Sequence, residues 1–239
     1  MARLPRIDVP GIPQHLIVRG NNRTDLFRDD ADRCIFLKLM QQALGACACD
    51  VHAYVLMPNH VHLVATGHLE GELSELMQRI GRKFARLVNI RWSRTGTLYE
   101  GRFWSSLIDS ERYLLTCMRY VELNPVRAGI VRHPKEFGWS SYRENAGGSP
   151  VGFLTPHELY TRLGATLEER SETYRALVAL GVTEDELALI RTSVAKRRAL
   201  GSAAFCEEME RLLKRFVAPR DQGRPGKEEL KWGQVQKLT

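Results

Sequence analysis

The chain has few cysteines, and they form no regular pattern. Its 239 residues include five of them, at irregular spacing: Cys34, Cys47, Cys49, Cys117 and Cys206. A small, odd and irregular set excludes the disulfide framework that holds small secreted domains together. We therefore expect the protein to work in a reducing compartment, the cytoplasm.

Long apolar runs are also lacking. No run of about 18 apolar residues is present that could span a membrane. The first residues, M-A-R-L-P-R-I-D-V-P-G, lack the apolar core of a secretion signal. We expect no membrane partner.

Positive charge, in contrast, is in excess. The formal net charge is +7, and the sequence pI is about 9.3. Net charge says little about the fold, but a basic protein associates readily with polyanions. This balance favours a polyanionic partner.

A change of composition near residue 150 predicts a division of the chain. Residues 145–150, N-A-G-G-S-P, have the glycine, serine and proline content of a linker. Residues 151–190 then carry three basic and seven acidic side chains, whereas residues 191–239 carry twelve basic and six acidic ones. We expect a main domain over 1–145, a helical region that could bind DNA over 151–218, and a flexible basic tail over 219–239.

The apolar residues of the first 145 positions alternate between strand and helix periods. They predict strands over 15–19, 51–57, 60–66 and 103–108, and helices over 30–46, 72–90 and 110–123, the last one capped by Ser110. This order of elements indicates an α+β fold, a ferredoxin-like antiparallel sheet covered by helices.

Two histidines stand one residue apart in the apolar run M-P-N-H-V-H-L-V, residues 57–64. Side chains at i and i+2 of a strand point to the same face, so His60 and His62 should lie about 6 to 7 Å apart. Imidazoles so placed can bracket one metal ion. Alternatively, they decorate the solvated face of an edge strand. A structural zinc site would need ligands such as Cys47, Cys49 or His52, whose spacing fits no usual zinc pattern.

A second motif, Y-V-E-L-N-P-V-R-A-G, covers residues 120–129. On a helix, Tyr120 and Asn124 would be i, i+4 neighbours on one face. Pro125 disfavours the helical conformation of Asn124, so we expect this asparagine at or just past the last helical turn. Its amide oxygen could then join a third ligand position. Alternatively, Tyr120 is a core aromatic residue on the same stripe as Tyr113 and Cys117.

These motifs together resemble one known group. M-P-N-H-V-H-L (57–63), Y-V-E-L-N-P-V-R-A-G, R-G-N-N-R (19–23), G-R-F-W (101–104) and W-S-S-Y (139–142) are similar to motifs of the HUH-type single-strand DNA transposases with one catalytic tyrosine. The resemblance is closest to their REP-associated relatives and covers about residues 10–143. It implies the HUH nuclease fold and the cleavage and rejoining of structured, REP-like hairpin DNA in a bacterial, nucleoid-associated setting.

The resemblance also implies roles for individual residues. Tyr120 would be the nucleophile, and His60, His62 and Asn124 would bind a divalent metal, Mg²⁺ or Mn²⁺. Attack of the tyrosine on phosphorus would leave a 5′-phosphotyrosine, and the step could reverse onto a second 3′-hydroxyl without ATP. Because two imidazoles and one amide are softer ligands than Mg²⁺ prefers, we expect better activity with Mn²⁺. Mobile members work as dimers whose partner supplies the tyrosine, whereas the REP-associated relatives look monomeric, so we favour a monomer over a homodimer.

Basic and aromatic residues near these motifs are candidate contacts to single-stranded or hairpin DNA. They fall into four groups: a basic stripe on the helix over 72–90 (Arg79, Arg82, Lys83 and Arg86), a cation beside a stacking surface (Arg102 and Trp104), residues within the family motifs (Arg19, Arg23 and Arg127), and a basic run between two short helices near the end (Lys196, Arg197 and Arg198). The stripe could equally be a solvated helix face, and Trp104 could belong to the core. The two short helices could form a helix-turn-helix-like hairpin or a subdomain packed on the core.

Two other functions remain open from the sequence. The same fold could bind a DNA or RNA hairpin without cutting it. It could also be a metal phosphoesterase that activates water and does not use Tyr120.

Overall fold

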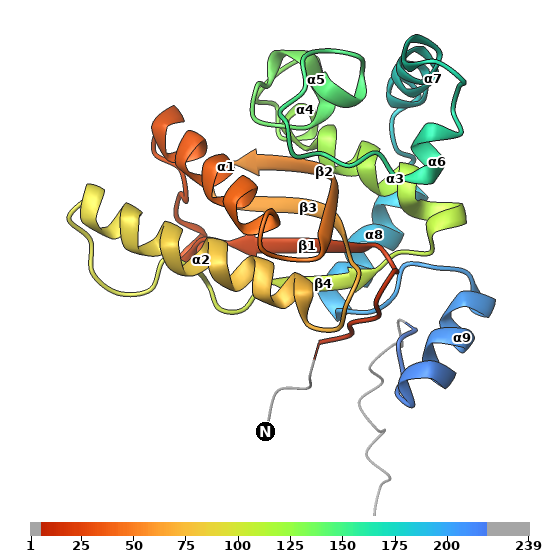
Figure 1. The fold of residues 1–239 in the computed structure, drawn as a ribbon, viewed down its shortest axis with the longest axis horizontal. Coiled ribbons are helices and arrows are strands. Elements are labelled where there is room, and N and C mark those ends of the chain that lie inside the picture. The colour runs from red at the N-terminus through yellow and green to blue at the C-terminus, as the bar shows by residue number, and fades with distance from the viewer. Residues whose placement is uncertain (1–5, 219–239) are drawn as a thin grey trace, which may run out of the picture.

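The computed structural model of the chain describes residues 6–218, and the residues of the expected basic tail over 219–239 lie outside this range. At its centre is an antiparallel sheet of four strands in the order β2-β3-β1-β4 (Figure 1). The strands are β1 (Gln14–Arg19), β2 (Cys49–Met57), β3 (His60–Gly67) and β4 (Trp104–Leu107). The predicted ferredoxin-like α+β fold is thereby confirmed. In residues 6–218, no helix combines the length and the apolar character needed to cross a membrane.

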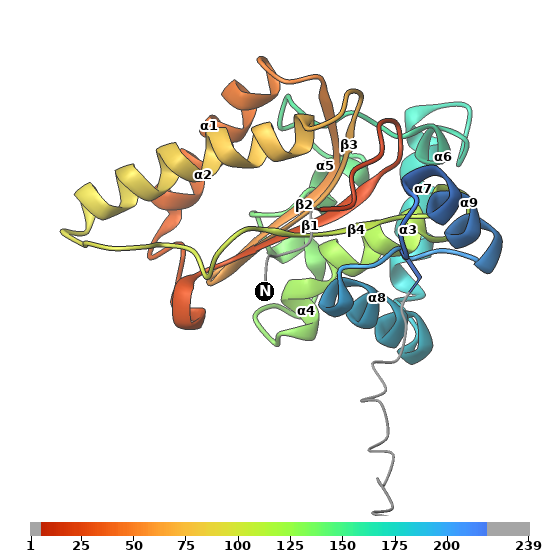
Figure 2. The same ribbon diagram turned by 90° about the horizontal axis from the view of Figure 1, so that it is seen from below.

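Helices cover both faces of this sheet (Figure 2). One face is covered by α1 (Asp30–Leu44) and α2 (Glu72–Arg91), and the other by α3 (Ser110–Glu122). The alternation of side chains along a strand divides the sheet residues between two cores. Val61, Leu63 and Ala65 of β3 pack in the core under α1 and α2. The side chains between them therefore face α3, and His60 and His62 are among these.

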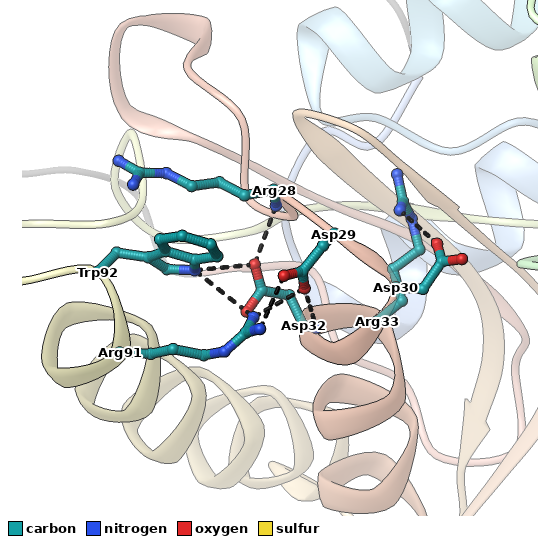
Figure 3. A network of polar contacts seen from close by, with 7 residues as sticks. All are labelled: Arg28, Asp29, Asp30, Asp32, Arg33, Arg91 and Trp92. Carbon is teal, nitrogen blue, oxygen red and sulfur yellow. Dashed lines mark hydrogen bonds and ion pairs between the residues drawn. The ribbon is translucent and has the colours of Figure 1, made fainter.

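A polar clamp joins the start of α1 to the end of α2 (Figure 3). Asp32 is completely buried, and its carboxylate accepts hydrogen bonds from Arg91 Nη1 at 2.5 Å and from Trp92 Nε1 at 3.1 Å. Arg91 Nη2 also donates to Asp29 at 2.7 Å. This guanidinium holds the pKa of Asp29 at about 2, below its usual value. The clamp fixes the two helices against each other and leaves the basic face of α2 exposed.

Beyond α3, the described part of the chain continues as helices and turns. These helices are α4 (Asn124–Arg127), α5 (Tyr142–Asn145), α6 (Glu158–Thr161), α7 (Leu167–Ala179), α8 (Glu184–Lys196) and α9 (Ala203–Leu213), with a 3₁₀ turn over Pro134–Glu136. Another 3₁₀ turn, Asn21–Arg23, follows β1. Tyr174 of α7 and Ile190 of α8 lie in the same buried cluster as Val121 of α3. Residues on both sides of 145–150 therefore share one core.

The segment between α8 and α9 is tied to the sheet and does not project from it. Leu200 N donates to Leu107 O at 2.7 Å, and Asp109 N donates to Leu200 O at 2.8 Å. α8 contributes to the core around α3, whereas α9 packs in a separate cluster with Ile7 and Leu107. Of the two arrangements that the sequence left open, this is the subdomain packed on the core.

Three local expectations need correction. Asn124 lies just past the last turn of α3, as expected, but it begins α4 and is not displaced from helical geometry, because Pro125 stands at the start of α4, where a missing N–H costs no hydrogen bond. Leu123, between α3 and α4, keeps a right-handed helical conformation. The N-cap of α3 is Asp109, one residue before the expected Ser110. The helical period over 72–90 predicts Leu87 on the apolar stripe that faces the core, but Leu87 is 42% exposed.

Candidate metal and tyrosine site

Two imidazoles of β3 face the start of α4. The ring centroids of His60 and His62 are 4.9 Å apart. His60 Nδ1 lies 2.6 Å from Asn59 Oδ1. An amide oxygen can only accept, so His60 carries its proton on Nδ1 and keeps the lone pair on Nε2.

The tautomer of His62 follows from its two neighbours. Its Nε2 lies 3.2 Å from Asn124 Nδ2, which can only donate, so Nε2 holds the lone pair. The proton therefore sits on His62 Nδ1 and is donated to His15 Nε2 at 2.8 Å. Both β3 histidines thus have Nε2 in the form that binds a metal ion.

His15 is a residue of this site that the sequence did not indicate. It lies on β1 and is 1% exposed, and its ring stacks on His62 at a centroid distance of 5.0 Å. Its own Nδ1 is buried without a partner among the described residues. No sequence motif indicates His15, because it is 47 positions from His62 and contacts it only through the pairing of β1 with β3.

All three imidazoles are neutral at neutral pH. Burial lowers the pKa of His15 to about 3, with a further contribution from Arg127. Burial and the charge of Arg19 lower the pKa of His60 to about 4. Burial, followed by the neighbouring His15, lowers the pKa of His62 well below its ordinary value. A neutral imidazole is the form that serves as a metal ligand.

The tyrosine of α3 lies over the same histidines. Tyr120 is 9% exposed, and its ring meets His62 edge-on at a centroid distance of 5.9 Å and His15 at 5.7 Å. Asn124 follows in α4 and reaches His62 with its amide. The structure therefore brings Tyr120, His60, His62 and Asn124 together within one chain.

Arg127 adds a positive charge to this cluster. Its Nη2 donates to the carbonyl oxygen of Tyr120 at 2.5 Å, and its guanidinium carbon lies 4.3 Å from the centre of the tyrosine ring. Burial lowers the pKa of Arg127. A guanidinium has five N–H donors, so it can hold Tyr120 and still donate to an anion beside it.

The residues present fit a divalent cation held by mixed ligands. Among the described residues, no group of three His, Cys, Asp or Glu side chains is placed to hold a metal ion. The candidate donors are instead the Nε2 atoms of the two histidines and the amide oxygen of Asn124, and they leave coordination positions for a substrate. Asn124 Nδ2 here donates to His62 Nε2, so its amide would have to turn and present the oxygen when a cation binds. Burial raises the pKa of Cys47 and of Cys49, so these thiols are poorly suited to the zinc alternative.

The other candidate DNA contacts fall into separate groups. Arg79, Arg82, Lys83 and Arg86 are exposed on α2, across the sheet from Tyr120, and Arg79 pairs with Glu75 at 2.8 Å. Arg23 is exposed in the 3₁₀ turn after β1. The remaining cations and the indole lie along β1 and the edge strand β4: Arg19, Arg102, Trp104, Lys196, Arg197 and Arg198.

Comparison with known proteins gives a family match and a shared fold. Residues 8–124 match the family described as IS200-like transposases. A protein of Haemophilus influenzae described as a REP-associated tyrosine transposase is 25% identical over an alignment of 119 residues, and the match covers 41% of this chain and 66% of that protein. The matched part thus spans slightly less than two thirds of that relative. A solved structure described as the REP-associated tyrosine transposase bound to a REP hairpin has the same fold, with a TM-score of 0.54 at 18% identity over 65% of this chain and 92% of the other.

Proposed function

We propose that this chain, whose residues 8–124 match the family of IS200-like transposases, is a metal-dependent enzyme that cleaves and rejoins single-stranded DNA beside a hairpin. One observation carries the proposal: a tyrosine lies against two neutral imidazoles and an amide that can hold a cation. A protein that only binds DNA has no need for this set. The relative with the same fold is described as bound to a REP hairpin, which supports the substrate class.

The residues of the site would have different roles in this reaction. His60, His62 and Asn124 would hold a divalent cation, which when bound polarises the scissile phosphate. The Tyr120 oxygen attacks phosphorus and loses its proton, a phosphorus–oxygen bond to the tyrosine forms, and the bond to the 3′-oxygen breaks. The leaving oxygen takes up a proton and becomes a 3′-hydroxyl. The 5′-phosphotyrosine keeps the bond energy, so attack by a second 3′-hydroxyl rejoins the strands.

The proposal is tested by detecting the covalent adduct between the protein and DNA. A hairpin oligonucleotide with single-stranded flanks and a 3′ label is incubated with the protein and Mn²⁺ and run on a denaturing gel. We expect a labelled adduct that disappears in Tyr120→Phe and in the presence of a chelator. Tyr113→Phe is the matched control, since Tyr113 lies on the same helix and should be dispensable.

The outcomes separate the competing functions. Cleavage that survives Tyr120→Phe would identify a phosphoesterase that activates water. Binding without cleavage under any metal would identify a binding module. For the metal, we expect a faster reaction with Mn²⁺ than with Mg²⁺, and a clear advantage for Mg²⁺ would contradict our view of the ligand set.

A further inference from the structure

The turn that follows β1 has a backbone that its own residues do not favour. It belongs to the motif R-G-N-N-R, residues 19–23, whose first residue stands opposite His60 in the sheet. Asn22 has a φ of +52° and Arg23 one of +59°, a left-handed region that is unfavourable for residues with a Cβ. Both side chains are exposed, so their packing does not require this backbone. Backbone strain of this kind gathers at functional sites.

Close contacts hold the turn against the hairpin between β2 and β3. Gly20 N donates to the carbonyl oxygen of Asn59 at 2.9 Å, and Arg23 N closes the turn on Gly20 O at 3.0 Å. A Cβ on Gly20 would collide with the carbonyl oxygen of Thr24, so the backbone can turn this closely only with glycine. The turn and the tip of the hairpin are therefore held as one unit.

The side chain of Asn59 connects this turn to a proposed metal ligand. Its Nδ2 donates to Arg23 O at 3.1 Å, and its Oδ1 lies 2.6 Å from His60 Nδ1. A backbone carbonyl can only accept a hydrogen bond, so Arg23 O draws the amide nitrogen to itself and turns the amide oxygen toward the imidazole. The amide oxygen can also only accept, so the proton of His60 is held on Nδ1. The direction of one carbonyl in the strained turn thus decides which nitrogen of His60 carries the lone pair.

This selection matters because the free imidazole has the opposite preference. In water, a neutral histidine carries its proton mainly on Nε2, which is the nitrogen that must be unprotonated to bind a cation here. His62 has His15 to hold its proton on Nδ1, and His60 has Asn59. The two ligands of β3 are therefore oriented by separate devices, one inside the sheet and one in the turn.

We propose that Asn59 is a positioning residue for metal binding and that the strained turn over 20–23 is the element that orients it. The assignment rests on the proposed function, because it takes His60 to be a metal ligand. The turn selects the metal-binding tautomer of His60 before a cation arrives, so it lowers the free energy that binding must supply. This gives the R-G-N-N-R motif a role in the site that needs no contact with DNA.

The first experiment reads the tautomer of His60 in the full-length protein without metal. Nitrogen NMR of protein labelled in its histidines distinguishes Nδ1–H from Nε2–H, and His60→Gln identifies the signal of that ring. We expect the Nδ1–H form in the wild type and a shift toward the Nε2–H form in Asn59→Ala. A residue that only stabilises the hairpin would lower the melting temperature and leave the tautomer as it is.

The second experiment measures Mn²⁺ affinity by titration calorimetry without DNA. Asn59→Ala should weaken binding by about 10- to 100-fold, the usual contribution of an outer partner. Asn59→Asp keeps an oxygen that accepts the His60 proton, so its tautomer and its affinity should stay close to those of the wild type. Asn89→Ala is the matched control: Asn89 also donates to a loop carbonyl, that of Gly96 at 3.1 Å, but it lies on α2 across the sheet.

A pair of substitutions at one exposed position tests the backbone of the turn. Arg23→Gly and Arg23→Val remove the same side chain, but glycine adopts a positive φ freely and a β-branched residue adopts it poorly. We expect Arg23→Val to bind Mn²⁺ about fivefold more weakly than Arg23→Gly, because its carbonyl no longer holds the Asn59 amide. Equal affinities of these two variants would refute the role of the turn.

The results separate this proposal from the proposed reaction. If Asn59→Ala keeps the tautomer of His60 or the Mn²⁺ affinity of the wild type, the positioning role is refuted, whether or not the wild type forms the DNA adduct. If both change and Asn59→Asp restores them, the positioning role stands, and a wild type that still forms no adduct refutes the reaction alone. A wild type that binds no Mn²⁺ would refute both.

Discussion

At the scale of single residues, the imidazole of His15 fixes which nitrogen of His62 carries the proton. It accepts the Nδ1 proton of His62, so the lone pair lies on Nε2, the atom that faces Asn124 and would bind the metal ion. Outer partners of this kind typically contribute about 10- to 100-fold to metal affinity. We expect His15→Ala to weaken Mn²⁺ binding by that factor, and His15→Gln, whose Oε1 can accept the same proton, to weaken it less. Titration calorimetry without DNA measures both.

The control for this prediction is His68→Ala. The His68 side chain is half exposed and pairs with Asp50, away from the site, so Mn²⁺ affinity should not change. Equal Mn²⁺ affinity of His15→Ala and the wild type, with both proteins folded, would show that His15 only fills space.

Arg127 allows a different test, because it contacts the tyrosine and not the proposed ligands. Its guanidinium lies against Tyr120 and can donate to the phosphate under attack. Removing one donor to a developing charge typically slows the chemical step by about 100-fold. We expect Arg127→Gln to slow adduct formation at saturating DNA by about this factor without weakening Mn²⁺ binding, because the charge of Arg127 adds to burial in lowering the pKa of His62 and so disfavours a cation there. Arg132→Gln, an exposed neighbour in the chain, should behave as the wild type.

How much of this site the sequence predicts depends on how local each contact is. The shared face of His60 and His62 follows from the period of one strand. The proximity of Tyr120 and Asn124 follows from their i, i+4 spacing, which survives because Leu123 keeps a helical conformation between α3 and α4. His15 reaches His62 only because Ile17 of β1 stands opposite His62 in the sheet. Neither periodicity nor spacing encodes that register, so no pattern in the sequence predicts His15.

At the scale of elements, a buried carboxylate on α3 ties this helix to the chain that follows it. Glu122 is fully buried, and its Oε1 accepts hydrogen bonds from Ser141 at 2.6 Å and from Asn145 at 2.8 Å. Its Oε2 accepts one from Tyr174 of α7 at 2.8 Å. Desolvation nevertheless dominates and raises the pKa of Glu122 to about 7. This network fixes the end of α3 that carries Tyr120.

The raised pKa of Glu122 makes stability depend on pH. The folded state keeps the proton up to about pH 7, whereas the unfolded chain releases it near 4.5. The contribution to stability is therefore fully present below pH 4.5 and is lost as pH rises through 7. Between pH 4.5 and 8, the free energy of unfolding of the wild type should fall relative to that of Glu122→Gln by up to roughly 3 kcal/mol.

Urea unfolding at several pH values measures this difference. The comparison with Glu122→Gln removes the contributions of the histidines, which titrate in both proteins. Glu111→Gln, an exposed change on the same helix, should run parallel to the wild type between pH 5 and 8. A constant difference between wild type and Glu122→Gln over this range would mean that Glu122 is ionised in the folded protein throughout.

At this scale the sequence predicts which segments form helices and strands, but it does not predict how the polar segments between them pack. N-A-G-G-S-P has the composition of a linker, yet Asn145 is buried against Glu122. Gly147 has a φ of +89°, and a Cβ there would lie 2.7 Å from Ser171 Oγ. Gly147 therefore permits a close approach between the end of α5 and α7, and it does not form a flexible spacer. Composition alone does not distinguish these two uses of glycine.

At the scale of the whole molecule, the tyrosine and the histidines meet within one chain. α3 lies directly on the sheet, because Val121 and Leu114 belong to the same core cluster as Val55 and Val64 of the strands. α7 and α8 pack against the same cluster through Tyr174 and Ile190 and hold α3 there. We therefore expect each chain to use its own Tyr120 if the proposed reaction takes place.

Mixing two inactive variants tests this arrangement. His62→Ala lacks a proposed metal ligand, and Tyr120→Phe lacks the proposed nucleophile. If each chain uses its own tyrosine, equal amounts of the two variants should form no adduct beyond that of each alone. A dimer that exchanges its tyrosines would instead contain one complete site in every mixed pair and would recover activity. Wild type mixed with either variant controls for interference between chains, and light scattering at the same concentration should give the mass of one chain, 27.2 kDa.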